Sequence, residues 1–263
     1  FEKRSMNLYF LLNLVPVILY NNINSKAMKT IFHPASDRSH ADHGWLNAHH
    51  SFSFASWYDP AKVHFGMLRV LNDDIVAGGQ GFGTHPHNDM EIITIILEGA
   101  LEHRDNMGNG SIIRPGDVQV MSAGTGVLHS EFNPSPTEKT NLFQLWVFPK
   151  ENGIAPRYDQ KTFDPNERKN KIQLVASGFK KNDELYIHQD AALSLSQLDA
   201  GKSLEYTMNK EGNGAYIMVI KGKLKIDEQE LGRRDALGLW ETQKFEIHAE
   251  EPSEILIVEV PMK

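Results

Sequence analysis

Short apolar runs separated by turn residues recur from about residue 65 to the end of the chain, and this pattern limits the fold more than any other feature. The runs are rich in Ile, Val and aromatic residues and are bounded by Gly, Pro, Asn or Asp. Such runs predict β-strands, and no long helical period accompanies them. They are GMLRVL (66–71), MEIITIILEG (90–99), VQVMSAG (118–124), LFQLWVF (142–148), AYIMVIKGKLKI (215–226) and EILIVEV (254–260). Turn signals at intervals of roughly 8–12 residues predict an all-β sandwich or barrel.

Two parts of the chain share one strand pattern. Residues 91–108, 114–132 and 141–148 resemble residues 215–227, 233–251 and 254–260 in the same order. In both parts a strand ends at a Gly, a hairpin follows, and a histidine, His129 or His248, precedes the closing strand. The repeat predicts two β-barrel domains in tandem, at residues 28–150 and 151–263.

The N-terminal 27 residues differ from the rest of the chain. They combine two basic residues, an apolar run at 8–20 and a Ser-Lys-Ala sequence that ends at Ala27. The run is shorter than the roughly 20 residues that a membrane-spanning helix needs, and Pro16 interrupts it, so we expect no membrane span. The segment is either a secretory signal or an upstream stretch with Met28 as the natural start. We expect it to lie outside the fold of a cytoplasmic protein, or of a periplasmic or secreted one if the signal is genuine.

Charge and cysteine content exclude several functions. The chain has 27 Lys and Arg against 34 Asp and Glu, a formal charge of −7, and no long basic run, so direct nucleic-acid binding is not expected. It has no cysteine, which excludes disulfides, thiolate nucleophiles and iron–sulfur clusters. Any metal must therefore be bound by nitrogen and oxygen, and the chain has twelve histidines.

The stretch FGTHPHNDMEI (82–92) spaces four potential ligands two residues apart: His85, His87, Asp89 and Glu91. If residues 84–93 form one strand, all four side chains face the same side. The two histidines could then bind one metal ion, although an HxH pair can also lie on an exposed strand edge. Asp89 is better explained as part of a bend. Glu91 is an even number of residues from the histidines, as a ligand on the same face would be, but a carboxylate at the start of a strand ordinarily faces solvent.

A second pair, His129 and Glu131, has the same spacing on a later strand. Together the two strands predict a site of three histidines and one carboxylate, which suits Fe(II), Mn(II), Ni(II) or Cu(II). The C-terminal repeat has only His248 near the equivalent place, so we predict that it lacks metal ligands. The remaining histidines are given no ligand role; they include His43, His49, His50, His64, His103 and His188.

These residues match the two cupin motifs. The first is matched by Gly79, His85, His87, Glu91 and Gly99, with one extra residue before the last Gly. The second is matched by Gly124, Gly126, His129 and Asn133, with Gly124 where a Pro is usual. The general cupin pattern would use Glu91 as the carboxylate ligand.

The chain from Met28 to Pro261 more closely resembles the pirin family of bicupins, in particular the bacterial members similar to quercetin 2,3-dioxygenase. The resemblance rests on HADHGWLNAHHSFSFASWYDP (40–60), LRVLNDD (68–74), GFGTHPHNDMEI (81–92), MSAGTGVLHSEFNPS (121–135) and ENGIAPRY (151–158). It implies two tandem cupin barrels, and one metal ion held by His85, His87, His129 and Glu131. The ion is usually iron, with Mn, Ni, Cu, Co and Zn as alternatives. We expect Glu131 rather than Glu91 to be the carboxylate ligand, and Glu91 to orient one of the ligand histidines.

The resemblance also implies a reaction. Such quercetinases open the heterocyclic ring of a flavonol with O2 and release carbon monoxide, and Glu131 would act as the general base. The partners would then be a planar phenolic substrate and O2. The main alternative is a non-enzymatic, metal-containing regulator that acts through a protein surface. A cupin sugar isomerase and a metal-free binding module are further alternatives, but no Lys/Arg cluster near His85 or His129 supports the isomerase.

Overall fold

The computed structural model describes residues 28–179 and 183–263. The predictions for residues 1–27 lie outside the described residues. Almost all regular structure in the described part is β-strand, as the alternating runs predict, with two short 3-10 helices, η1 (Ala35–Asp37) and η2 (Pro165–Arg168). No helix in the described ranges has the length and apolarity to cross a membrane.

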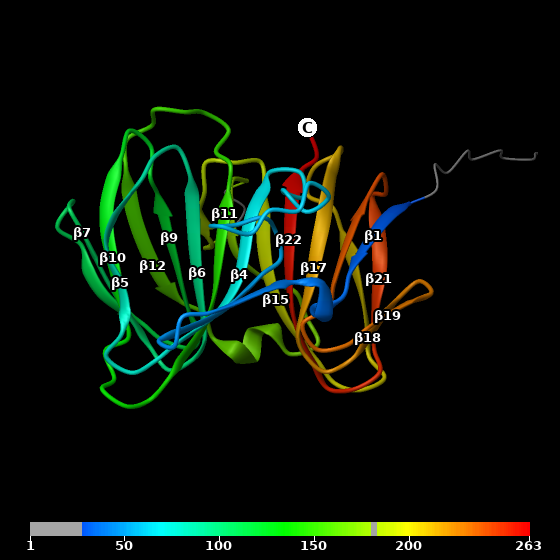
Figure 1. Ribbon diagram of the computed structural model, residues 1–263. Helices are drawn as coiled ribbons and strands as arrows, with labels where there is room; N and C mark the ends of the chain where they lie inside the picture. The colour runs from blue at the N-terminus through cyan, green and yellow to red at the C-terminus, as the bar shows by residue number, and fades with distance from the viewer. Residues whose placement is uncertain (1–27, 180–182) are drawn as a thin grey trace, which may run out of the picture.

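Two β-barrels lie side by side, and each consists of a seven-stranded and a four-stranded sheet (Figure 1). In the N-terminal barrel the seven-stranded sheet has the order β12 (Arg157–Thr162), β9 (Asp117–Ser122), β6 (Glu91–Glu98), β11 (Thr140–Val147), β4 (Leu68–Val76), β3 (Leu46–His50), β2 (Ser39–Asp42). Its four-stranded sheet has the order β5 (Gly81–His87), β10 (Val127–Phe132), β7 (Leu101–Asp105), β8 (Gly110–Ile113).

The C-terminal barrel repeats this arrangement. Its seven-stranded sheet has the order β1 (Lys29–His33), β20 (Ala236–Trp240), β17 (Asn213–Lys221), β22 (Ser253–Pro261), β15 (Ala192–Leu198), β13 (Gln173–Ser177), β14 (Leu185–Tyr186). Its four-stranded sheet has the order β16 (Ser203–Thr207), β21 (Lys244–Ala249), β18 (Leu224–Ile226), β19 (Gln229–Leu231). The order β9-β6-β11-β4 thus has its counterpart in β20-β17-β22-β15, which confirms the predicted fold of two repeated β-barrels.

The barrels exchange their edge strands. β1, from the start of the described chain, pairs with β20 of the C-terminal barrel, and β12 pairs with β9 of the N-terminal barrel. Figure 1 shows the blue β1 on the C-terminal side and the green β12 on the N-terminal side. These two strands therefore do not follow the predicted division at residue 150, because each belongs to the sheet of the other barrel. For the remaining strands the division stays a proposal.

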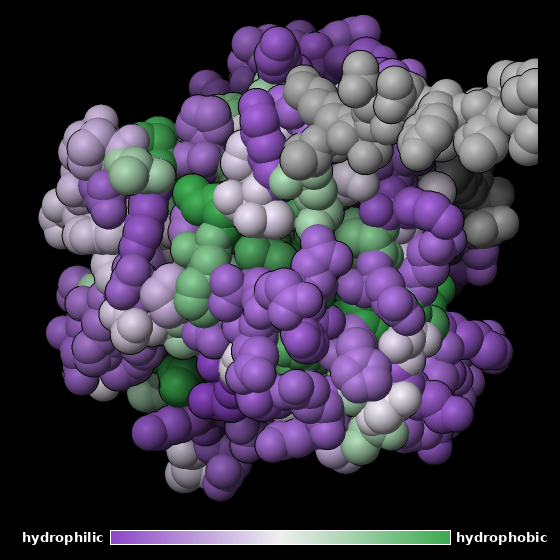
Figure 2. All heavy atoms as spheres, turned by 90° about the vertical axis from the view of Figure 1, so that its right-hand side faces the viewer, coloured by the Kyte–Doolittle hydropathy of each residue, from purple (hydrophilic) through white to green (hydrophobic). Residues whose placement is uncertain are grey.

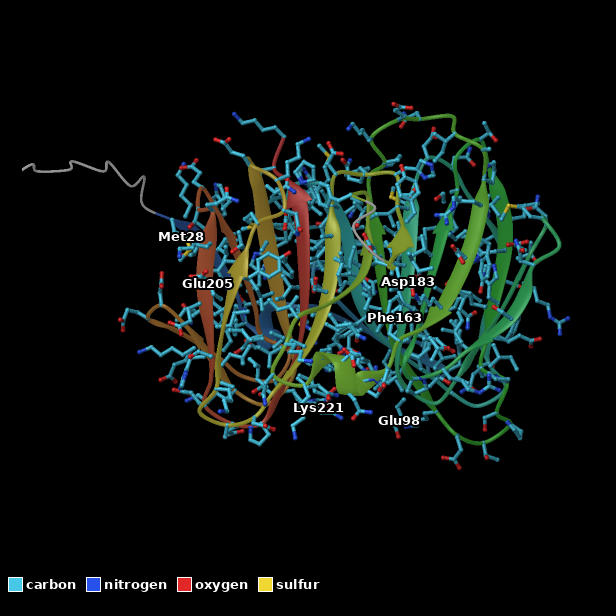
Figure 3. All side chains as sticks on the ribbon, turned by 180° about the vertical axis from the view of Figure 1, so that it is seen from behind. Met28, Glu98, Phe163, Asp183, Glu205 and Lys221 are labelled. Atoms are coloured by element: carbon cyan, nitrogen blue, oxygen red, sulfur yellow. The ribbon has the colours of Figure 1, made fainter. Side chains whose placement is uncertain are left out.

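The two seven-stranded sheets meet in a shared apolar core. One buried cluster contains residues from both sheets, including Phe143 and Leu145 of β11 and Leu256 and Val258 of β22. Phe163, which follows β12, belongs to the same cluster and lies between the barrels (Figure 3). Each sheet therefore buries both faces, one toward its own barrel and one toward its neighbour, which accounts for the nearly continuous apolar runs in the sequence.

The outer sheets have one face in water. The exposed end of the C-terminal barrel, seen in Figure 2, is mostly hydrophilic with scattered apolar residues. On β21 of this end, buried and exposed residues alternate along the strand. This is the pattern expected of a sheet with one face on the core and one in solvent.

Candidate metal centre

Two paired strands of the N-terminal barrel carry the predicted ligands. β5 carries His85 and His87, and β10 carries His129 and Glu131. His129 lies opposite His85, and the register then shifts so that Glu131 lies opposite Phe82. Such a shift is a β-bulge, which re-aims neighbouring side chains. Because His129 and Glu131 are two residues apart and both buried, they face the barrel interior together.

The three histidines form one compact cluster. Nε2 of His129 lies 3.0 Å from Nε2 of His85, and one ligand atom from each of His85, His87 and His129 lies within 4.8 Å of the others. Nδ1 of His85 lies 2.8 Å from the carbonyl oxygen of Gly83, which can only accept a hydrogen bond. In the neutral ring the proton therefore sits on Nδ1, and Nε2 keeps a lone pair that faces His129.

Burial keeps two of the rings neutral. It lowers the pKa of His87 to about 4, with a smaller contribution from His85. It also lowers the pKa of His129 to about 3, and the neighbouring histidines, His85 first, add to this shift. At neutral pH each of these rings therefore offers a lone pair rather than a positive charge, as a metal ligand must.

Glu131 lies next to the histidine cluster. Its side chain is buried, and Nε2 of Gln144 donates to its two carboxylate oxygens at 3.2 and 3.1 Å. Burial raises the pKa of Glu131 to about 7, against the opposing effect of the Gln144 hydrogen bonds. A ligand atom of Glu131 lies within 4.8 Å of one from His129 and one from His103, so Glu131 is close to one side of the cluster.

A divalent metal ion fits this donor set. Two nitrogen atoms 3.0 Å apart, as in His85 and His129, suit neighbouring ligands of one ion, because metal–nitrogen bonds measure roughly 2.0–2.1 Å. A cation would also stabilise the buried carboxylate of Glu131, whose ionisation burial disfavours. Imidazole and carboxylate donors together suit several transition metals, so the residues do not select one.

Residues 84–93 do not form one strand, so the condition under which all four side chains would share one face is not met. β5 ends at His87, β6 begins at Glu91, and the two strands belong to different sheets. Asp89 lies in the bend between them with a left-handed φ of 45°, and its Oδ1 accepts a hydrogen bond from the Gly153 backbone N–H at 2.7 Å. The bend ends the strict alternation, so neither Asp89 nor Glu91 shares the face of the histidines.

Glu91 is fully buried and contacts a different part of the molecule. Its Oε2 accepts hydrogen bonds from Ser122 Oγ at 2.9 Å and from the backbone N–H of His188 at 3.1 Å. Burial raises its pKa to about 7. It does not line the cavity beside the histidines, whereas Glu131 does. This placement favours Glu131 over Glu91 as the carboxylate ligand, and the assignment of all four ligands stays a proposal.

The cavity beside the cluster has a volume of about 90 Å³. Its lining consists of Leu46, Ala48, His50, Phe54, Asn72, Asp74, Phe82, His85, His87, His129, Glu131, Gln144 and Trp146. Three buried polar atoms of this lining have no hydrogen-bond partner within the described structure: Asn72 Oδ1, Asp74 Oδ1 and Trp146 Nε1. They could hydrogen-bond a bound ligand. Sequence reasoning did not identify these residues, because they lie on strands far from the HxH and HxE motifs.

His103 is the histidine whose importance the sequence analysis missed. It is fully buried on β7, and its Nδ1 lies 3.4 Å from Nδ1 of His129. The sequence contained a pattern that could have identified it, since His103 and Asp105 show the same spacing of two residues as the other candidate pairs. Among the described residues, the candidate metal-ligand clusters consist of His85, His87 and His129, and of His103, His129 and Glu131.

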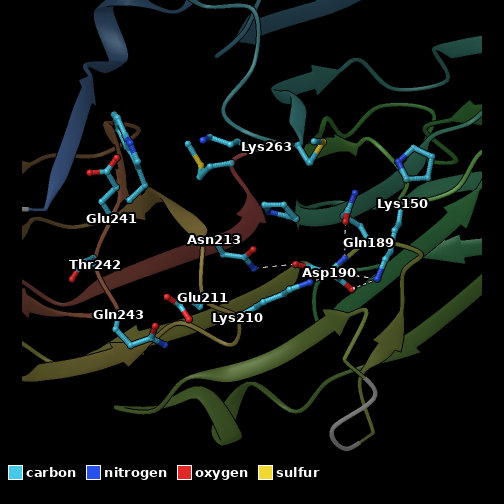
Figure 4. Close-up of a pocket in the computed structure, with 16 residues that line it drawn as sticks. Lys150, Gln189, Asp190, Lys210, Glu211, Asn213, Glu241, Thr242, Gln243 and Lys263 are labelled. Carbon is cyan, nitrogen blue, oxygen red and sulfur yellow. Dashed lines mark hydrogen bonds and ion pairs between the residues drawn. The ribbon is translucent and has the colours of Figure 1, made fainter. Parts of the chain in front are cut away.

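A larger groove lies elsewhere, at the junction of the barrels (Figure 4). It has a volume of about 1,100 Å³ and is lined by residues such as Lys150, Asp190, Lys210 and Asn213. Three of its charged residues are paired with one another: Nζ of Lys150 lies 2.9 Å from an oxygen of Asp190, which also pairs with Lys210. Its lining includes none of the four proposed metal ligands, so its size does not make it the reaction site.

Comparison with known proteins agrees with this architecture. Residues 32–147 match the family described as Pirin, and residues 174–260 match the quercetinase C-terminal cupin domain. The chain is 46% identical to quercetin 2,3-dioxygenase of Escherichia coli K12 over 227 residues, which cover 86% of this chain and 96% of that protein. It is 44% identical to a pirin-like protein of Caulobacter vibrioides, over 83% of this chain and 94% of that protein.

A solved structure is equally similar. The bacterial pirin YhhW from Escherichia coli, in complex with nickel(II), superposes with a TM-score of 0.84 at 43% identity, over 89% of this chain and 99% of that one. The relatives' names agree with the predicted relation to quercetin 2,3-dioxygenase. Since the similarity extends over both barrels, this chain belongs to the pirin family of bicupins.

Proposed function

We propose that this protein is a metal-dependent dioxygenase that opens the heterocyclic ring of a flavonol such as quercetin with O2 and releases carbon monoxide. The observation that carries the proposal is the cluster of three histidines beside a buried carboxylate, at a cavity in the N-terminal barrel. Relatives named quercetin 2,3-dioxygenase support the choice of reaction.

In this proposal His85, His87, His129 and Glu131 hold the metal. Iron is the proposed ion, and the nickel(II) complex of the related YhhW makes nickel an alternative. When bound, the ion would stabilise a substrate oxyanion as a Lewis acid and offer open coordination positions. The protein would supply a fixed set of neutral imidazoles, since burial lowers the pKa of His87 and His129.

Glu131 would accept the proton of the flavonol 3-hydroxyl. Its carboxylate lines the cavity, where it could reach a hydroxyl of a bound substrate and act as general base. The two hydrogen bonds from Gln144 fix the orientation of the carboxylate. Loss of the proton leaves an electron-rich enolate that can react with O2.

The cavity restricts how such a substrate binds. A volume of about 90 Å³ is below the roughly 300–1,000 Å³ of pockets that enclose a drug-sized ligand. Only the ring edge that carries the hydroxyl and the carbonyl would be enclosed. Trp146 and Phe54, which contact each other edge to face at 5.3 Å, would pack against the planar ring.

The test begins with the metal content of the purified protein, followed by quercetin loss and carbon monoxide release under O2. His85→Ala should lower both metal content and turnover. Glu131→Gln should lower turnover by about 100-fold or more, because it removes the proposed base. Glu91→Gln is the matched control, a buried glutamate outside the cavity, and should retain metal and turnover. Normal metal content in His85→Ala would refute the site.

A second candidate is a metal-containing regulator that binds another protein. The observation that favours it is the outer face of β10, where Leu128 and Phe132 are 44% and 40% exposed. Large apolar side chains exposed on the same face of one strand favour an interaction surface. This candidate predicts bound metal but no O2 consumption with flavonols, so the same experiment separates the two functions.

A further inference from the structure

A buried hydrogen-bonded chain extends behind His129, on the side away from the cavity. Nδ1 of His103 lies 3.4 Å from Nδ1 of His129, and Nε2 of His103 lies 3.2 Å from Oδ2 of Asp105. The side chains of His103 and Asp105 are both fully buried. The pairing of β10 with β7 produces this arrangement, with His129 opposite Asp105 and Glu131 opposite His103.

The far end of this chain is fixed. Oδ1 of Asp105 accepts hydrogen bonds from the backbone N–H groups of Met107 at 2.9 Å and Asn109 at 3.0 Å. Oδ2 accepts a further hydrogen bond from Nδ2 of Asn109 at 2.8 Å. The carboxylate is therefore held by the turn after β7 and can only accept from His103.

The direction of each hydrogen bond follows. Because Asp105 accepts, the proton of the neutral His103 ring is on Nε2, and its Nδ1 has a lone pair. Nδ1 of His129 must then donate to His103. This leaves the lone pair of His129 on Nε2, the atom that lies 3.0 Å from Nε2 of His85.

We propose that His103 and Asp105 are positioning residues that fix the tautomer and ring orientation of His129 for metal binding. The inference rests on the proposed function, in which His129 is a ligand. Partners of this kind, behind a metal-binding histidine, typically change metal affinity by about 10–100-fold.

The alternative is that His103 is itself a ligand, because its ligand atom lies within 4.8 Å of those of His129 and Glu131. Three observations favour the positioning role. Nε2 of His103 already donates to Asp105, and the ring is stacked on Tyr158 of the exchanged strand β12, with centroids 4.7 Å apart. His103 also does not line the cavity, so an ion bound there would lack room for substrate.

The experiment titrates the metal-free full chain with Co²⁺, by calorimetry and by the visible absorption of the bound ion. His103→Leu removes the acceptor for His129 and should weaken Co²⁺ binding by about 10–100-fold and shift the absorption bands. His103→Asn places an amide oxygen near the position of Nδ1 and should restore most of the affinity. Asp105→Asn should show a smaller loss, because a neutral acceptor holds the His103 proton less strongly.

Two reference variants make the outcomes distinct. His248→Leu changes a histidine of the C-terminal barrel and should leave Co²⁺ binding unchanged, whereas His129→Ala should abolish it.

Parent-like binding in His103→Leu, with loss in His129→Ala, would overturn the positioning role and leave the metal site intact. Loss in His103→Leu as complete as in His129→Ala would make His103 a ligand. Parent-like binding in His129→Ala would refute the proposed ligand set. If His103→Leu does not fold, as judged by thermal unfolding, parent-like Co²⁺ binding and spectra in Asp105→Asn would overturn the inference.

Discussion

The two barrels share one strand order but differ in one row of residues across the interior of the seven-stranded sheet. In the N-terminal barrel this polar row runs through neighbouring strands as Gln119, Thr94, Gln144 and Asn72. At the corresponding places of the C-terminal barrel, the apolar row runs as Leu237, Ile217 and Ile257, followed by Ser194. Both rows are buried.

The facing four-stranded sheets differ in the same way. The buried positions of β10 hold Val127, His129 and Glu131, and those of β21 hold Phe245, Ile247 and Ala249. His248, which the repeat places near His129, lies on the other face of β21, with Nδ1 3.0 Å from Ser203 Oγ. The lack of metal ligands in the C-terminal barrel stays a prediction; the described residues that fill its interior are apolar.

The difference shows what a buried site costs the fold. The interior of the C-terminal barrel is one apolar cluster of sixteen buried residues, whereas the buried apolar residues inside the N-terminal barrel form separate clusters of seven and four. Apolar burial is the main stabilising contribution to a fold. The N-terminal barrel, which holds the candidate site, therefore has less apolar burial in its interior. The apolar core that it shares with the C-terminal barrel offsets this smaller contribution to stability.

The first prediction concerns the contact between the barrels and has the largest expected effect. Nε of Arg234, in the C-terminal barrel, donates to Oδ2 of Asp73, in the N-terminal barrel, at 2.6 Å, and both side chains are buried. Asp73→Ala leaves a buried cation with less compensation and should lower the free energy of unfolding by about 3–5 kcal/mol. Urea unfolding measures this.

Its control is the exposed pair Lys244 and Glu205, where Glu205→Ala should cost less than about 1 kcal/mol. If the two barrels depend on each other, the parent unfolds in one transition. A parent that unfolds in two transitions would contradict that dependence.

The second prediction exchanges the residue types of the polar row and the apolar row at one pair of corresponding positions, Gln144 and Ile257. Ile257→Gln places an amide in an apolar interior and should destabilise the protein by roughly 2–5 kcal/mol, from lost apolar burial and unpaired polar atoms. The reciprocal Gln144→Ile removes the hydrogen bonds to Glu131 and should lower flavonol turnover at least about 10-fold while the fold persists. Thermal unfolding and turnover are measured for both variants. Equal destabilisation with unchanged turnover would show that the rows have no separate roles.

The third prediction concerns metal removal. An ion present at about 100 times its dissociation constant stabilises the folded state by about 2.7 kcal/mol. Chelation should therefore lower the midpoint of thermal unfolding, and amide hydrogen exchange should become faster in β5 and β10 but not in β16 and β21. Equal changes in both pairs of strands would place a metal in the C-terminal barrel as well.

The fourth prediction concerns pH. Burial raises the pKa of Glu91 to about 7 from its ordinary value of 4.5, so the folded state binds this proton more tightly than the unfolded state. Its contribution to stability is therefore present below about pH 4.5 and is lost as the pH rises through about 7. Glu91→Gln should flatten this part of the curve of unfolding free energy against pH. The exposed Glu98→Gln should leave it unchanged, and an unaltered slope in Glu91→Gln would contradict the prediction.

Much of the fold could be predicted from local pattern. The apolar runs at 90–99 and 142–148 became β6 and β11, and the repeat anticipated the matching strand orders. The HxH and HxE pairs could also be found, because a spacing of two residues within one strand fixes a common face. Asp89 and Glu91 could not be assigned by this rule, since the bend after His87 sends the chain from one sheet to another.

By itself the sequence determined which residues share a strand face, that the chain repeats one β-architecture, and that any metal ligands are nitrogen and oxygen atoms concentrated in the first repeat. Only the tertiary structure decided that Glu131 rather than Glu91 lies at the cavity, that β1 and β12 change barrels, and that His103 lies behind His129. The physical reason is the separation along the chain between the residues that interact. Side-chain alternation is a property of one strand, whereas these contacts depend on the register between strands distant in the chain and on how two sheets pack.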